Sequence, residues 1–138
     1  MKASKQIAVG FSTAFILFVL LCAVLLLRPS LARRSLPWGA SDIHEHYVDS
    51  RFGSDFERCL RASTTERGFR EYAARLGLDR VYSEAEHHNL GLLWPSCDEP
   101  WWDPPESMEG ALFRQDDEDY FVLAKYEDGR VYFAAVCW

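Results

Sequence analysis

Two histidines separated by one residue, His44 and His46, have the spacing in this chain that comes nearest to a metal site. On an extended strand they point to the same face, and a His-x-His pair can bind a metal ion in that way. A usable site needs a third ligand, for which the sequence offers His87 or His88. One interpretation is therefore a metal-dependent hydrolase. The other, which we favour because no H-E-x-x-H motif occurs, is a solvated strand that binds no metal or other cofactor.

Three tryptophans, Trp94, Trp101 and Trp102, lie in a segment rich in proline and acidic residues. Exposed tryptophans on a loop can stack on sugar rings or anchor a protein partner. They are candidates for binding a saccharide or an envelope protein. Large aromatics can equally cover the open side of a small core, and we favour that interpretation. Adjacent residues of an extended segment point in opposite directions, so we expect one ring of the 101–102 pair to be buried and Trp102 to be exposed.

The four cysteines give little indication of metal binding or disulfide formation. Cys22 lies in an apolar run, whereas Cys59, Cys97 and Cys137 follow it at spacings that match no zinc-ligand pattern. Those three thiols allow at most one internal disulfide, and buried, weakly reactive thiols are the simpler interpretation. No G-x-S-x-G, P-loop or G-x-G-x-x-G motif is present, so the sequence identifies no catalytic residue and favours a protein that is not an enzyme.

Alternating and helical patterns predict the elements that carry these residues. Residues 41–48 and 56–62 alternate as a β-hairpin around Gly53. Ser63 with Glu66 predicts a capping box, after which apolar residues at helical spacing run to Gly77.

The second half of the chain predicts less regular structure. Residues 82–88 suggest a helical turn, residues 90–94 a short strand, and the prolines that follow exclude regular elements. Residues 119–126 and 130–138 predict a second hairpin around an Asp-Gly turn. The predicted fold class is α+β, a small ββαββ domain with one antiparallel sheet packed on a helix.

The N-terminal region has the strongest single signal. Residues 7–27 carry no charge, and a helix of that length spans about 30 Å, the thickness of a bilayer core. We expect a membrane anchor over residues 1–34 and an extracytoplasmic domain over residues 35–138. The alternative is a signal peptide cleaved after Ala32, although its apolar part would be unusually long.

Charge divides the chain in the same place. Residues 1–34 hold five basic residues and no acidic one, whereas the remainder holds ten basic and 21 acidic residues. An acidic domain repels phosphate, so nucleic-acid binding is not expected.

Three stretches resemble uncharacterised small bacterial membrane-anchored proteins: LPWGASDI, FREYAARLGL and DGRVYF. The resemblance implies their architecture and a bacterial cell-envelope location, and it supplies no functional residues. The resulting prediction is a single-pass, membrane-anchored, non-enzymatic binding or accessory module.

Overall fold

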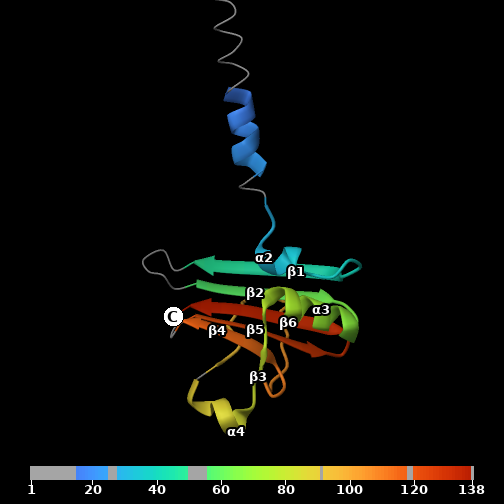
Figure 1. Cartoon of the computed structure of the whole chain (residues 1–138), viewed down its shortest axis with the longest axis vertical. Coiled ribbons are helices and arrows are strands. Elements are labelled where there is room, and N and C mark those ends of the chain that lie inside the picture. The colour runs from blue at the N-terminus through green and yellow to red at the C-terminus, as the bar shows by residue number, and fades with distance from the viewer. Residues whose placement is uncertain (1–14, 25–27, 50–55, 91, 118–119, 138) are drawn as a thin grey trace, which may run out of the picture. The chain divides into compact units, whose positions relative to one another are not determined.

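The computed structural model describes residues 15–24, 28–49, 56–90, 92–117 and 120–137 (Figure 1). The chain falls into two compact units, Met1–Ser30 and Leu31–Trp138. In the first unit, residues 15–24 are helical, and the rest of the apolar run at 7–27 lies outside the described residues. Within the described ranges, no helix combines the length and the apolar character needed to cross a membrane.

The second unit is built on one antiparallel sheet of six strands in the order β1-β2-β6-β5-β4-β3. The strands are β1 (Ser41–Asp49), β2 (Phe56–Ser63), β3 (Arg80–Val81), β4 (Leu112–Asp117), β5 (Tyr120–Glu127) and β6 (Arg130–Cys137). The α+β class and both predicted hairpins are confirmed, with β1 paired to β2 and β5 paired to β6. The predicted count of four strands is wrong, because β3 and β4 were not recognised.

Helix α3 (Glu66–Leu76) covers one face of the sheet, as Figure 1 shows. Its predicted cap is wrong: Ser63 ends β2, and Thr65 is the N-cap, accepting a hydrogen bond from the Gly68 amide at 3.1 Å. Its predicted C-terminus is confirmed, since Gly77 adopts a left-handed conformation with φ of 68°. The core under the helix consists of buried residues from several elements: Ala32, Leu36, Leu60, Ala62, Phe69, Tyr72, Ala73, Leu76, Leu78, Val122, Ala124, Val131, Phe133 and Ala135.

The opposite face of the sheet is covered by the irregular segment at 82–111. Side chains alternate between faces along a strand, so Leu123 and Ala134 lie on the side away from α3. There they join a second buried cluster: Tyr82, Leu92, Met108, Ala111, Phe113, Phe121, Leu123 and Ala134. The segment includes α4 (Glu84–His87) and a 3-10 turn (His88–Leu90), which agrees with the predicted helical turn. Residues 92–94 form no strand, so that prediction is wrong.

The residues leading into β1 belong to the folded unit. Helix α2 (Leu31–Arg34) buries Ala32 in the core, and Ser35 and Leu36 are also buried. The Arg75 guanidinium on α3 donates to the backbone carbonyls of Ser35 and Leu36, each at 3.1 Å. These two hydrogen bonds hold the approach to β1 against α3.

Candidate functional site

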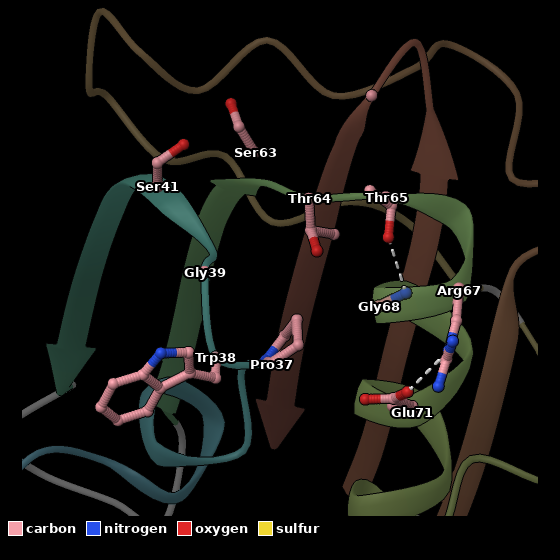
Figure 2. Close-up of a pocket in the computed structure, with 11 residues that line it drawn as sticks. Pro37, Trp38, Gly39, Ser41, Ser63, Thr64, Thr65, Arg67, Gly68 and Glu71 are labelled. Carbon is pink, nitrogen blue, oxygen red and sulfur yellow. Dashed lines mark hydrogen bonds and ion pairs between the residues drawn. The ribbon is translucent and has the colours of Figure 1, made fainter.

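A pocket of about 360 Å³ lies where the approach to β1 meets the end of β2 and the start of α3 (Figure 2). It has an aromatic ring on its rim and hydroxyl groups along its wall. The residues that line it are Pro37, Trp38, Gly39, Ser41, Ser63, Thr64, Thr65, Arg67, Gly68, Glu71 and Gly129.

A tight turn presents the aromatic ring. The Ala40 amide donates to the Pro37 carbonyl at 3.1 Å, and Gly39 has φ of 101°. A positive φ at the third residue of a four-residue turn is typical of a type II turn, and glycine accommodates it without strain. Trp38, between them, is fully exposed. A free indole face on a rigid turn is a surface suited to stacking.

The floor of the pocket depends on close approach between the turn and α3. A Cβ placed on Gly68 would come within 2.3 Å of the Thr64 hydroxyl oxygen and 3.0 Å of the Pro37 Cγ. Only glycine therefore allows the turn to lie this near the first turn of the helix. The Thr64 amide also donates to the Gly129 carbonyl at 2.9 Å, which ties the pocket to the β5–β6 turn.

Charged groups flank the hydroxyls at the start of α3. The Arg67 Nε donates to the Glu71 Oε1 at 3.2 Å, and the Arg67 side chain is 90% exposed. An ion pair this exposed contributes little to stability and leaves both groups accessible to a ligand. The pocket thus combines one apolar ring, several hydroxyls and one charge of each sign.

The two strand histidines share a face, as predicted. That face lies under the segment that carries Trp94, Trp101 and Trp102, which we call the tryptophan segment. The His44 Nε2 and the Asp42 Oδ1 are 2.8 Å apart, and the His44 ring stacks on Trp101. The His46 Nδ1 lies 2.9 Å from the Glu99 Oε1. The hydrogen bond with His44 holds the pKa of the Asp42 carboxyl below its usual value. Each imidazole is thus already engaged by a carboxylate of this chain.

The other two histidines lie in the α4 region. The His87 ring packs on Tyr82 and on Phe113 of β4, and His88 follows in the 3-10 turn. Four strand spacings separate β1 from β4 in the sheet order, which is about 19 Å. The fold therefore keeps His87 away from His44 and His46. Across the described residues, no three His, Cys, Asp or Glu side chains form a group that could hold a metal ion.

All three candidate tryptophans are partly buried. Trp102 packs edge-on against Trp94, Trp101 and Tyr132, and its Nε1 donates to the Pro95 carbonyl at 3.0 Å. The expected exposure of Trp102 is wrong, because its ring lies among the other aromatic rings. Neither ring of the 101–102 pair is free, so the segment covers this part of the sheet.

Ion pairs fasten the same segment to the sheet. The Arg61 Nη1 donates to the Trp101 carbonyl at 2.6 Å and to the Asp103 Oδ1 at 3.0 Å. The Arg130 Nη1 donates to the Asp103 Oδ2 at 3.2 Å. Burial by itself would raise the pKa of the Asp103 carboxyl. The hydrogen bond and charge of Arg61, together with the charge of Arg130, outweigh this effect and hold the pKa below its usual value.

No protein-family model, curated protein or solved structure matches this chain. The chemistry of its own residues is therefore what points to a function. Trp38 did not stand out among five tryptophans in the sequence. The signal that identifies it is local: Pro37 and Gly39 on either side predict a turn that projects the residue between them.

Proposed function

We propose that this protein is a single-pass, membrane-anchored binding module of the bacterial cell envelope, without catalytic activity. In this proposal residues 7–27 anchor the chain and the acidic domain faces the extracytoplasmic side. The observation that carries the binding role is the fully exposed Trp38 ring at the rim of a 360 Å³ pocket. Binding sites typically join an apolar surface to a few placed polar groups, which is the composition of this pocket.

The ligand class that this lining favours is a saccharide. One face of a sugar ring is apolar and stacks on an indole, while its hydroxyls exchange hydrogen bonds with side-chain hydroxyls and carboxylates. Ser41, Ser63 and Thr64 supply hydroxyls, and Glu71 supplies a carboxylate. An envelope polysaccharide is a ligand of this kind that an anchored extracytoplasmic domain would meet.

Two properties of the sequence support the location. Residues 7–27 are uncharged and long enough for a bilayer, and basic residues flank them on both sides. The acidic domain would be repelled by an anionic lipid surface, which favours a domain that stands away from the headgroups.

The test is co-sedimentation of the detergent-solubilised full chain with insoluble envelope polysaccharide. We expect Trp38→Ala to weaken binding about tenfold or more, as loss of a central aromatic anchor does. Trp38→Phe, which keeps a smaller ring, should retain part of the affinity.

Leu93→Ala is the matched control, because Leu93 is also a large exposed apolar residue but does not line the pocket. Its affinity should equal that of the wild type. Equal binding by the wild type and Trp38→Ala would exclude this pocket as the saccharide site.

A further inference from the structure

Two cysteines that lie far apart in the sequence meet under the tryptophan segment. Cys59 lies on β2, opposite His46 of β1 and Ala134 of β6. Because Ala134 belongs to the cluster on the side away from α3, Cys59 points to the same side. His46 reaches Glu99, which lies two residues after Cys97. Since His46 lies beside Cys59 and Glu99 lies close to Cys97 in the sequence, these contacts bring the two thiols near each other, and each influences the pKa of the other.

The third cysteine of the domain does not compete for this position. Cys137 lies opposite Phe56 and Tyr120 on its neighbouring strands. On β6 the residues at odd positions, Val131, Phe133 and Ala135, belong to the core under α3. Strand alternation places Cys137 on that face, so the sheet separates it from Cys59.

Both thiols of the pair are shielded from solvent to different degrees. Cys59 is only 2% exposed, whereas Cys97 is partly exposed on the covering segment. Burial raises the pKa of Cys59, with the neighbouring Cys97 adding to the effect, and burial also raises the pKa of Cys97. Thiolate is the reactive form, so neither residue is activated as a catalytic nucleophile. A structural role fits this environment better.

We propose that Cys59 and Cys97 form a disulfide that fastens the tryptophan segment to the sheet. The oxidant is a disulfide of another thiol compound, such as glutathione disulfide. The Cys97 sulfur attacks one of its sulfurs and releases one thiol, and the Cys59 sulfur then displaces the second thiol from Cys97. Two S–H bonds and one S–S bond are exchanged for one new S–S bond and two released thiols, which carry the two protons.

The bond would stabilise the domain through its unfolded state. It closes a loop that contains α3, β3 and α4, which greatly restricts the unfolded chain. It would also add a covalent tie to the ion pairs that Asp103 makes with Arg61 and Arg130. The proposal is independent of the ligand pocket, which lies on other residues.

The experiment treats the detergent-solubilised full chain with glutathione disulfide, blocks free thiols, and maps linked peptides by mass spectrometry. We expect a Cys59–Cys97 peptide and a melting temperature that rises by about 10 °C and falls back with reductant. Cys137→Ser should keep both results, and Cys97→Ser should lose both.

A link that joins Cys137 to either partner, or glutathione attached to Cys97 without a Cys59 link, would overturn the proposal. Formation of the link only in denaturant would also overturn it, because the native approach of the thiols would then play no part. If Cys97→Ser does not fold, the peptide map of the wild type and of Cys137→Ser still decides the question.

Discussion

The most deeply buried tyrosine of the described structure carries a hydroxyl with no hydrogen-bond partner there. Tyr72 lies on the buried face of α3 and is fully buried. Its ring packs edge-on against Phe133, and its hydroxyl meets no donor or acceptor in the described residues. Burial, with the nearby Glu45 charge, raises the pKa of this phenol well above its usual value, so the group stays neutral. An unpaired buried hydroxyl costs free energy that a phenylalanine would not.

We therefore expect Tyr72→Phe to raise the free energy of unfolding by about 1 kcal/mol. Tyr72→Ala, which also removes the ring, should lower it by about 3–5 kcal/mol. Chemical denaturation of the three proteins measures both changes. A destabilised Tyr72→Phe protein would mean that the hydroxyl has a partner, such as an internal water molecule.

Asp103 makes the attachment of the tryptophan segment sensitive to pH. Its pKa is lower in the folded state, so its ionised form stabilises the fold above the unfolded value of about 4. That contribution is lost as the pH falls through the lower, folded value. We expect the melting temperature of the wild type to exceed that of Asp103→Asn near pH 6, and the gap to shrink below pH 4.

Glu106→Gln is the control for this titration, because Glu106 is an exposed carboxyl of the same segment. Its melting temperature should follow that of the wild type at every pH. A constant gap for Asp103→Asn from pH 6 to pH 3 would show that its carboxylate charge does not matter.

Residue positions were predictable where a strand imposed its alternation. The shared face of His44 and His46 followed from their spacing. Their partners did not, because Glu99 and Trp101 come from an irregular segment whose path has no period. The same absence of period explains why the orientation of Trp102 was predicted wrongly.

At the scale of elements, the start of α3 offers a direct test of capping. The Thr65 hydroxyl accepts a hydrogen bond from the Gly68 amide, whereas Ser63 lies opposite Arg130 of β6 at the end of β2. We expect Thr65→Ala to lower the free energy of unfolding by about 1 kcal/mol, as loss of an N-cap does. Ser63→Ala should change it much less. Denaturation curves that show the larger loss for Ser63→Ala would restore the capping box first expected from the sequence.

The elements that were predicted correctly all carry a local signal. The apolar face of α3 repeats at helical spacing, and Asp128 and Gly129 both have the positive φ angles that a tight hairpin turn requires. The missed strands lack such a signal. β3 is two residues long, and β4 ends in charged residues. Their pairing becomes visible only when distant segments meet.

For the whole molecule, we predict that the full chain fractionates with membranes and resists extraction by alkaline carbonate. The physical reason is the uncharged run at residues 7–27. Immunoblotting of membrane and soluble fractions measures this. Soluble protein with Arg33 at its N-terminus would show cleavage after Ala32 instead.

The two ends of the strand order bear on aggregation. An open antiparallel sheet presents unpaired amides and carbonyls at its edges, which invites a second molecule to add strands. Here one edge, β3, is only two residues long. The other, β1, has an irregular register near Asp42, whose φ is 49°, and carries charged or ionisable side chains at Asp42, His44, Glu45 and His46. Short, distorted and charged edges oppose edge-to-edge pairing, so this sheet is protected against fibril-like self-association even where many copies are crowded together.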